Sequence, residues 1–252
     1  MSVRTLKLTI AYDGTDYAGW QIQASRKPTI QGTLQRVLGR ILQEPVHVVG
    51  SGRTDAGVHA LGQVAHVRIR RAIPCDKLRR ALNSVLPPEI VVRRIEEVGP
   101  DFHARFFALR KRYRYQIVTG PVVLPFERRY VWHVRQPLQA HLMRREASVL
   151  RGRHDFRAFH GAGRAVRDTR RIVSDLRLSA RNGRLTIEIE ADGFLYTMVR
   201  SIVGTLVEIG RGHRPAGTMA KLLKRRERRL AGPTAPPHGL CLLDVRYSFG
   251  KN

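Results

Sequence analysis

The chain has 252 residues, and its 46 Lys and Arg side chains outnumber its 20 Asp and Glu side chains, which gives a formal net charge of +26. A hydrophobic content of 42% excludes a disordered polyelectrolyte, and the length suggests one large domain or two modest ones. Of the cations, 39 are Arg, whose planar guanidinium group binds phosphate through paired hydrogen bonds. We therefore expect a polyanionic partner, above all a nucleic acid; the alternative is an arginine-rich surface that is merely solvated.

The cysteines and the N-terminal residues bear on the cellular compartment. Cys75 and Cys241 have no neighbouring Cys or His at metal-ligand spacing, so neither a disulfide framework nor a structural zinc site is indicated. The chain reaches the polar Tyr12-Asp13-Gly14 before the apolar region of a signal peptide develops. No run approaches the length of about 18 apolar residues that a membrane-spanning helix needs. We expect a soluble, cytoplasmic protein.

In the first half, hydrophobic periodicity and turn residues predict six elements around one long loop. In chain order these are a strand at 3–12, a helix between Thr29 and Pro45, a strand at 46–49, a glycine-bounded loop at 50–62, a strand through 65–69, a helix from Asp76 to Pro87 and a strand at 90–98. This order is the split βαβ, or ferredoxin-like, pattern, in which helices cover one face of an antiparallel sheet.

The second half repeats this pattern in element order rather than in residue identity. Its predicted elements are a strand at 113–118, a helix at 138–150, a hairpin of 171–178 and 185–191 around Asn182-Gly183, helices at 198–209 and 219–230, and a strand at 240–249. We predict an α+β fold of two pseudo-duplicated ferredoxin-like halves, 1–105 and 106–252, with mainly antiparallel sheets that flank a basic cleft. The second half carries most of the charge, since 105–184 contains 20 Lys and Arg but only 5 Asp and Glu.

The most informative segment is GSGRTDAGVHA at 50–60, because glycines bracket an Arg and an Asp in a loop between two strands. Such glycines allow the backbone to approach a ligand closely. The segment lacks the third glycine and the parallel βαβ context of a dinucleotide-binding fingerprint, and it does not match the Walker pattern. Taken alone, it fits equally well a functional loop and an ordinary turn in which Asp55 accepts backbone hydrogen bonds.

The stretch GRTDAGVHA at 52–60 resembles the signature loop of the tRNA pseudouridine synthase A family. The resemblance spans nearly the whole chain, because it continues through RYRY at 112–115, HDF at 154–156, 194–200 leading into IVG at 202–204, and APPHGL at 235–240. It implies isomerisation of uridine to pseudouridine at positions 38, 39 and 40 in the anticodon stem-loop of tRNA, without a cofactor. It also implies that the protein is a homodimer.

The resemblance assigns the catalytic carboxylate to Asp55, which would either attack C1′ of the ribose or remove the C2′ proton. Arg53 or Arg200 would keep this carboxylate ionised, because a nearby cation favours its charged form. From spacing alone, Arg200 would instead be a surface charge on a helix whose residues Met198 and Ile202 belong to a core.

Tyr113 resembles the family's active-site tyrosine, whose ring stacks on the target base after that base has left the helix. Stacking contributes roughly 1 to 3 kcal/mol per base, close to the few kcal/mol that unstacking costs. Without the resemblance, Tyr113 would be interpreted as a core aromatic residue between Arg112 and Arg114. Tyr115 lies on the same face of the predicted strand, so only the motif separates the two tyrosines.

Two other groups of residues carry weaker signals. His154 and His160 lie in an arginine-rich stretch without convergent ligands, so we predict no metal site and interpret most of the histidines as polar surface or core residues. The basic run KRRERR at 224–229 is either a solvated helix face or a rail for phosphates.

Two rival functions are compatible with this charge and fold. A non-catalytic RNA-binding module could use ferredoxin-like sheets to hold single-stranded RNA without chemistry. A metal-dependent nuclease would need clustered carboxylates, and none converge in the sequence.

Overall fold

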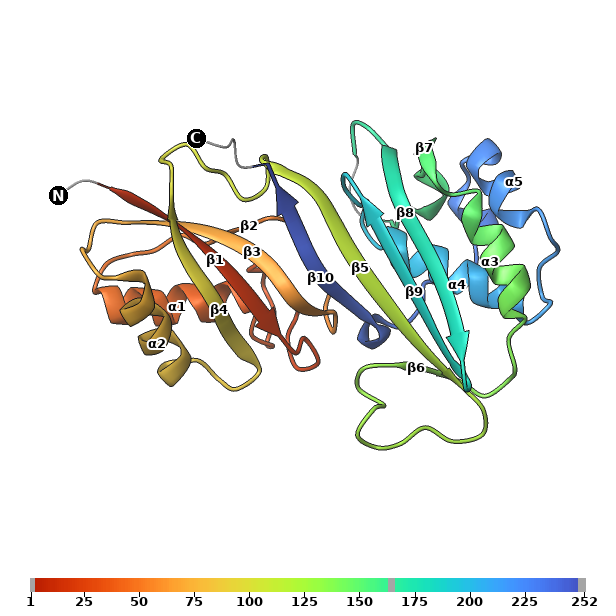
Figure 1. The fold of residues 1–252 in the computed structure, drawn as a ribbon, viewed down its shortest axis with the longest axis horizontal. Coiled ribbons are helices and arrows are strands. Elements are labelled where there is room, and N and C mark those ends of the chain that lie inside the picture. Colours follow the sequence, from red (N-terminus) through yellow and green to blue (C-terminus); the bar gives the residue numbers. More distant parts are fainter. Residues whose placement is uncertain (1–2, 163–165, 249–252) are drawn as a thin grey trace. The chain divides into compact units, whose positions relative to one another are not determined.

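The computed structural model describes residues 3–162 and 166–248, and the chain divides into two compact units. Unit 1 consists of Met1–Leu109 and Leu242–Asn252, and unit 2 consists of Arg110–Cys241. Both contain helices and strands (Figure 1), and the strand pairs are mainly antiparallel. The predicted α+β class with mainly antiparallel sheets is therefore confirmed.

Unit 1 begins with four strands and two helices in the predicted order. They are β1 (Arg4–Tyr12), α1 (Ile30–Leu42), β2 (Val49–Gly50), β3 (His59–Ile69), α2 (Cys75–Val85) and β4 (Ile90–Val98). β1 pairs antiparallel with both β3 and β4, and β2 pairs antiparallel with β3. The chain between β2 and β3 is thus a loop with a paired strand at each end.

The strand predicted at 46–49 is wrong apart from its last residue, which belongs to β2. The reason is that helix side chains take the backbone groups of Val48 that a strand would use. Val48 N–H donates to Gln35 Oε1 at 3.0 Å, and Gln31 Nε2 donates to the Val48 carbonyl at 2.8 Å. Both glutamines belong to α1, so this segment is fixed to the helix rather than to the sheet.

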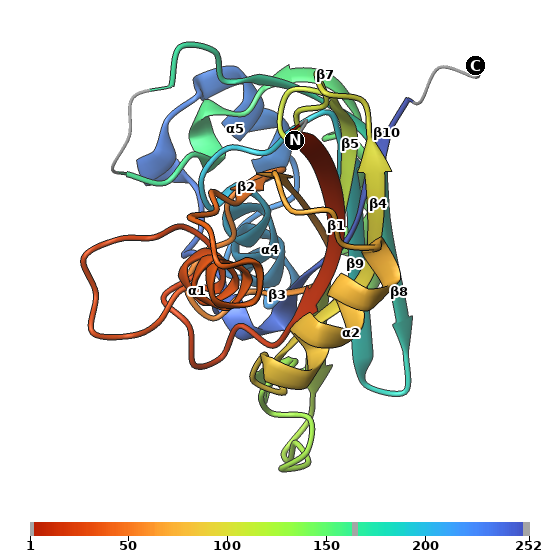
Figure 2. The ribbon, with the colours of Figure 1, turned by 90° about the vertical axis from the view of Figure 1, so that its left-hand side faces the viewer.

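One face of β1 contributes to the core of unit 1. Leu6, Leu8 and Ile10 alternate along the strand and are fully buried, as are Leu34 and Leu38 on the apolar stripe of α1. Each such side chain stabilises the fold by about 1.5–3 kcal/mol when it is buried. α2 contacts both α1 and β4, and Figures 1 and 2 show the two helices next to each other beside the sheet.

The opposite face of this sheet is covered by the segment that follows β4. Phe102 and Ala104 of that segment are buried against Val64 of β3. Tyr247 belongs to β10 (Leu240–Tyr247), and its ring centroid lies 5.3 Å from that of Phe102. Its hydroxyl group donates a hydrogen bond of 2.7 Å to the Ala104 carbonyl. The end of β10 therefore completes the interior of unit 1.

Unit 2 is built around a central hairpin. Its elements are β5 (Ala108–Thr119), β6 (Trp132–Val134), α3 (Ala140–Ser148), β7 (Gly152–Asp155), β8 (Arg170–Arg181), β9 (Arg184–Ala191), α4 (Met198–Gly210) and α5 (Thr218–Arg225). β9 pairs antiparallel with β5 and β8, β7 pairs antiparallel with β8, and β6 pairs parallel with β5. The predicted turn residues Asn182 and Gly183 have φ values of 48° and 73°, which the tight hairpin turn requires.

The structure corrects the predicted elements of unit 2 in two respects. β6 and β7 are missing from the prediction, because segments of only three and four residues are too short to give a strand signal. The helix predicted at 219–230 ends at Arg225, since Arg226 adopts a left-handed conformation with φ of 59°. Arg228–Leu230 then forms a separate short 3₁₀ turn.

The end of the chain and the helix lengths bear on two other predictions. β10 ends at Tyr247, and Phe249, the last residue of the strand predicted at 240–249, lies outside the described residues. Within 3–162 and 166–248, no helix has the length and apolar character that crossing a bilayer requires.

Candidate active site

The loop at 51–58 is shorter than the predicted loop at 50–62, because β3 begins earlier than expected. Its first residues are fixed by Gln63, which lies within β3 and is fully buried. Ser51 Oγ donates to Gln63 Oε1 at 2.7 Å, and Gln63 Nε2 donates to the Gly52 carbonyl at 3.1 Å. Neutral hydrogen bonds in the interior of unit 1 therefore hold the start of the loop.

The middle of the loop is anchored through Thr54, whose side chain is buried. Tyr12 at the end of β1 shares a hydrogen bond of 2.8 Å with Thr54 through their hydroxyl groups, and Trp20 N–H donates to the Thr54 carbonyl at 3.1 Å. Val58 N–H closes a turn onto the Asp55 carbonyl at 3.2 Å. These bonds fix the backbone on both sides of Asp55 while its side chain stays partly exposed.

Two glycines allow the segment after β1 to pack directly against this loop. A Cβ atom on Gly14 would lie 2.1 Å from the Val58 carbonyl oxygen, and one on Gly19 would lie 2.7 Å from the Thr54 carbonyl oxygen. Gly19 also has φ of 95°, which residues with side chains rarely adopt. Any larger residue at either position would push the two segments apart, so these glycines are required for the packing.

Arg53 and Asp55 belong to this same loop but have different surroundings. Arg53 is exposed, and its Nε donates to Gln21 Oε1 at 3.1 Å. After the loop, His59 Nδ1 lies 3.0 Å from Asp13 Oδ1. The loop thus presents a cation and a carboxylate on a backbone that buried hydrogen bonds hold in place. Such a loop can bind a large ligand without a change of conformation.

The structure distinguishes the two tyrosines of β5. Tyr115 is fully buried, its hydroxyl donates to the Pro236 carbonyl at 2.7 Å, and burial raises its pKa far above the usual range, although the positive charge of Arg200 acts in the opposite direction. Tyr113 retains 8% exposure, and its ring lies 5.0 Å from that of Phe194 in an edge-to-face arrangement. Tyr115 is therefore a structural residue of unit 2.

Arg200 lies in the first turn of α4 and binds the segment before β10. Its Nε donates to the Ala235 carbonyl at 2.8 Å, and Ala235 N–H donates to the Arg200 carbonyl at 3.1 Å. Gly204, one turn later, allows this approach, because a Cβ atom there would lie 1.8 Å from the Pro233 carbonyl oxygen. Arg200 is thus more than a surface charge, since it joins α4 to the motif at 235–240.

The arginines that flank Tyr113 are held by carboxylates of β9. Arg112 Nη2 lies 2.7 Å from Glu190 Oε2, and Arg114 Nη2 lies 2.8 Å from Glu188 Oε1. Glu190 also lies 3.2 Å from Arg110 Nη1. These cross-strand pairs orient the guanidinium groups on one face of the paired strands β5 and β9.

Sequence reasoning missed Gln63 and Trp20 as parts of this site. A glutamine within an alternating strand is expected to face solvent, so its burial was not predicted. The available signal was the spacing of Gly14 and Gly19 before a tryptophan, since closely spaced glycines beside a large aromatic residue indicate tight backbone packing.

The titratable residues do not assemble a metal centre in the described ranges 3–162 and 166–248, where no three His, Cys, Asp or Glu side chains are placed to hold an ion. Neither Cys75 nor Cys241 forms a disulfide bond. His66 of β3 is 5% exposed, and burial lowers its pKa to about 4, assisted by the charges of His103 and Arg68. His66 is therefore a neutral core residue at physiological pH.

Comparison with known proteins identifies the family. Two segments of the chain, 8–106 and 147–248, match a family model described as tRNA pseudouridine synthase. The chain belongs to the tRNA pseudouridine synthase family. The family resemblance found in the sequence is confirmed. The two matched segments contain Arg53, Asp55 and Arg200, whereas Tyr113 lies between them.

Full-length relatives of this tRNA pseudouridine synthase give the same assignment. The tRNA pseudouridine synthase A of Moorella thermoacetica is 49% identical over 243 residues, covering 96% of this chain and 99% of the relative. That of Thermoanaerobacter pseudethanolicus is 44% identical over 245 residues, covering 97% of this chain and 100% of the relative. The protein is therefore an isomerase that converts uridine to pseudouridine in tRNA.

A solved structure gives a much weaker match. A chain in the crystal structure of a Cbf5-Nop10-Gar1 complex is 12% identical with a TM-score of 0.40, and the match covers 94% of this chain and 48% of that one. A likeness at this level does not by itself establish a fold.

Proposed function

We propose that this enzyme modifies uridines 38, 39 and 40 in the anticodon stem-loop of tRNA, with Asp55 as the catalytic carboxylate and without a cofactor. The observation that carries the assignment is the anchoring of Asp55, whose backbone is hydrogen-bonded on both sides while the side chain stays partly exposed. The reaction breaks the N1–C1′ bond and forms a C5–C1′ bond; C5 loses its proton to solvent, and N1 takes up a proton. It transfers no electrons, so it requires no redox cofactor.

The carboxylate of Asp55 can act in either of two ways. It can attack C1′ of the ribose, which leaves uracil free to turn before C5 displaces the carboxylate, or it can remove the C2′ proton and return it to C2′ later. Both routes need an ionised carboxylate at a fixed distance from the sugar. The hydrogen bonds of Thr54 and Gln63 provide that fixed position, since they hold the loop without contributing charge of their own.

Tyr113, Arg53 and Arg200 are the proposed substrate-binding residues. Tyr113 would stack on the extruded uracil, with about 1–3 kcal/mol of stacking energy to offset the cost of unstacking it. The edge-to-face contact with Phe194 supports this role, because it holds the ring in one orientation. Arg53 and Arg200 are both candidates for the cation that keeps Asp55 ionised.

The proposed assembly is a cytoplasmic homodimer. In each protomer, two ferredoxin-like halves, 1–105 and 106–252, would flank a basic cleft for the anticodon arm. The support for a dimer is an exposed apolar segment after β5, where Val122 is 70%, Leu124 58% and Phe126 90% exposed. Monomeric proteins rarely leave such a run of apolar side chains uncovered. Sedimentation velocity measures this oligomeric state directly.

Tritium release from tRNA labelled at C5 of uridine tests the catalytic assignment. We expect release with the wild-type enzyme and a loss of about 1,000-fold or more in Asp55→Ala, because no other carboxylate occupies the loop. Asp55→Asn, which preserves the shape of the side chain, should be equally inactive. Asp101→Ala is the matched control, since Asp101 is an exposed carboxylate of unit 1 outside the loop.

Measurements of tRNA binding distinguish a catalytic role of Asp55 from a role in RNA binding alone. Filter binding of the same tRNA should give similar affinities for the wild-type enzyme and for Asp55→Ala, since contacts of arginines with phosphates contribute most of the binding free energy. Tritium release by Asp55→Ala at the wild-type rate would refute the role of Asp55.

A further inference from the structure

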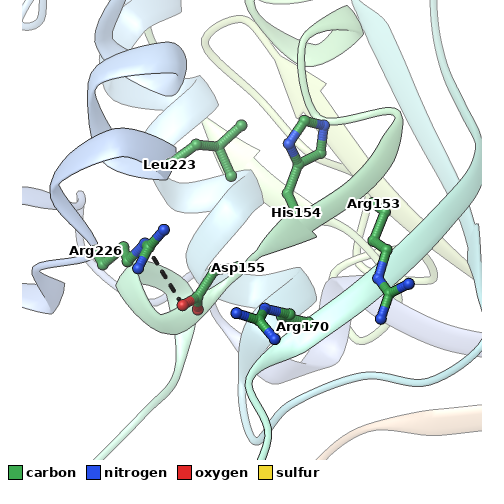
Figure 3. A pocket seen from close by; sticks show the side chains of 6 residues that line it. All are labelled: Arg153, His154, Asp155, Arg170, Leu223 and Arg226. Carbon is green, nitrogen blue, oxygen red and sulfur yellow. Dashed lines mark ion pairs between the residues drawn. The ribbon is translucent and has the colours of Figure 1, made fainter.

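Unit 2 contains a positively charged pocket of about 320 Å³ that the catalytic assignment does not use. It is lined by six residues, shown in Figure 3: Arg153, His154 and Asp155 of β7, Arg170 of β8, Leu223 of α5, and Arg226 directly after α5. Three guanidinium groups surround a single carboxylate, and one of the six side chains is aliphatic. The pocket brings together the HDF motif and the basic run at 224–229, which are far apart in the sequence.

Asp155 is fixed in this pocket and remains ionised. Its Oδ1 accepts hydrogen bonds from Thr169 Oγ1 at 2.6 Å and from Arg157 N–H at 3.0 Å, while its Oδ2 lies 3.5 Å from Arg226 Nε. Burial acts to raise the pKa of Asp155, but these hydrogen bonds and the charges of Arg157 and Arg226 lower it below the usual value. Asp155 therefore neutralises one of the three guanidinium groups.

Arg153 and Arg170 retain their positive charges uncompensated. Asp155 is paired with Arg170 in the ladder of β7 and β8, and Arg153 lies two residues before Asp155, so all three share one face of the strands. In the described part of the chain, neither Arg153 nor Arg170 forms an ion pair with a carboxylate. The pocket thus presents two exposed guanidinium groups toward solvent beside an anchored third.

Arg226 occupies a backbone position that normally favours glycine. It ends α5 with φ of 59° and ψ of 24°, and its N–H donates to the Leu222 carbonyl. A residue with a side chain in this conformation costs roughly 1 kcal/mol relative to glycine. The conformation directs the Arg226 side chain toward Asp155, as Figure 3 shows.

We propose that this pocket binds a backbone phosphate of the tRNA substrate, an inference that rests on the proposed function. Two exposed guanidinium groups on one face match the geometry of a phosphate, which accepts paired charge-assisted hydrogen bonds from Arg. The scarcity of apolar lining disfavours an aromatic cofactor, which would need a largely hydrophobic pocket. Because phosphate contacts position an RNA without reading its sequence, the pocket would orient the tRNA rather than select the target uridine.

The double variant Arg153→Gln/Arg170→Gln tests this proposal. We expect its Kd for tRNA to rise about 10-fold, and the slope of log Kd against log salt to fall by about one, the value for one lost phosphate contact. The matched control is Arg177→Gln/Arg181→Gln, which removes two exposed arginines of β8 that lie outside the pocket. Its Kd should stay within about twofold of the wild-type value.

Two further measurements, one on Arg226→Gly and one with inorganic phosphate, make the outcome decisive. Arg226→Gly suits the left-handed backbone, so it should fold and should also weaken tRNA binding, which covers the case in which the double variant is unstable. Equal Kd values for the pocket and control double variants would overturn the proposal. A second result would also overturn it: inorganic phosphate stabilises the wild-type enzyme but not the pocket variant, while the pocket variant binds tRNA as the wild type does. That result would assign the pocket to a free anion.

Tritium release at saturating tRNA keeps this test separate from that of the proposed function. The pocket variant should reach the wild-type maximal rate, since the pocket contributes to binding and not to chemistry. Absence of release from the wild-type enzyme would contradict the proposed function, whereas wild-type release with unaltered binding in the pocket variant would contradict the phosphate site alone.

Discussion

The Asp55 loop of unit 1 (51–58) and the paired strands β5 and β9 of unit 2 are supported by opposite kinds of polar contact. In the loop and beneath it, Ser51, Thr54 and Gln63 are buried and neutral; Ser51 is hydrogen-bonded to Gln63, and Thr54 to Tyr12. Between β5 and β9, the buried carboxylate of Glu190 forms ion pairs with Arg110 and Arg112. The difference indicates that neutral hydrogen bonds fix the position of the loop, whereas ion pairs between β5 and β9 fix the positions of charged side chains.

The two kinds of contact respond differently to solution conditions. Neutral hydrogen bonds in a dry interior are nearly independent of salt and of pH, and each contributes about 1 kcal/mol. Ion pairs near the surface are weakened by salt and by protonation of the carboxylate. We therefore expect the position of Asp55 to be robust over a wide range of conditions and the arginines of unit 2 to be sensitive to them.

Gln63→Leu is the strongest test of the neutral support. It removes the hydrogen bonds of a fully buried side chain, among them those with the Ser51 hydroxyl and the Gly52 carbonyl. Each such loss costs about 1–3 kcal/mol, so we expect the free energy of unfolding to fall by about 3 kcal/mol. Because the loop loosens, the rate of tritium release at saturating tRNA should fall as well. Urea denaturation and the tritium assay measure the two effects.

Gln31→Leu provides the control for this variant. Gln31 is also a buried glutamine of unit 1 with two side-chain hydrogen bonds, one from Ile22 N–H and one to the Val48 carbonyl. Its loss should destabilise unit 1 comparably, because the same groups are left unsatisfied. It should spare the maximal rate at temperatures where the protein is folded, since its side chain does not contact the loop. Equal rate losses in both variants would show that stability, not loop position, limits activity.

Much of this architecture could be predicted from the sequence, because long elements carry strong periodic signals. The strand over 90–98 has the predicted bounds, and the hairpin turn at Asn182-Gly183 has the predicted geometry. β7 could not be predicted, since its four residues Gly152–Asp155 are polar and it exists through pairing with β8. Tertiary contacts, not local propensity, create such short strands.

The candidate site was predictable only in part, for a related reason. The motif identified the loop of Asp55, but the buried support from Gln63 depends on which face of β3 is inward at that point. Polar residues in a strand are ordinarily expected on the solvent side, and the sequence pattern does not show that the buried face of β3 also carries a polar residue beneath the loop. Similarly, the pairing of Arg226 with Asp155 joins residues from distant elements, so their separate motifs did not reveal the pocket.

Glu190→Gln tests the ionic support of unit 2. The substitution removes the charge that holds Arg110 and Arg112, although one of these guanidinium groups is half exposed and can be solvated. We expect a loss of about 2 kcal/mol in the free energy of unfolding, less than for a fully buried ion pair. Glu188→Gln is the control, because Glu188 is more exposed and its contact with Arg114 should contribute less than about 1 kcal/mol. Equal losses in the two variants would contradict the distinction.

The smallest expected effect concerns His66, a strongly perturbed histidine in the interior of unit 1. Its Nδ1 accepts a hydrogen bond of 3.1 Å from Ala104 N–H, and burial lowers its pKa from 6.5 to about 4. Below about pH 6.5, the unfolded chain therefore binds a proton that the folded chain does not. Stability should fall as the pH drops from about 6.5 to about 4, and this contribution should be constant above that range.

The loss assigned to His66 should be on the order of 1–2 kcal/mol, because partial solvation reduces the roughly 3 kcal/mol that the whole change in pKa would give. Urea denaturation at a series of pH values measures it. His66→Gln can still accept a hydrogen bond from Ala104 N–H but does not titrate, so its stability should vary less with pH than that of the wild-type protein. His141→Gln, at an exposed position, should keep the wild-type slope. An unchanged slope in His66→Gln would mean that the acid sensitivity arises in other titrating groups, such as the carboxylates of the ion pairs in both units.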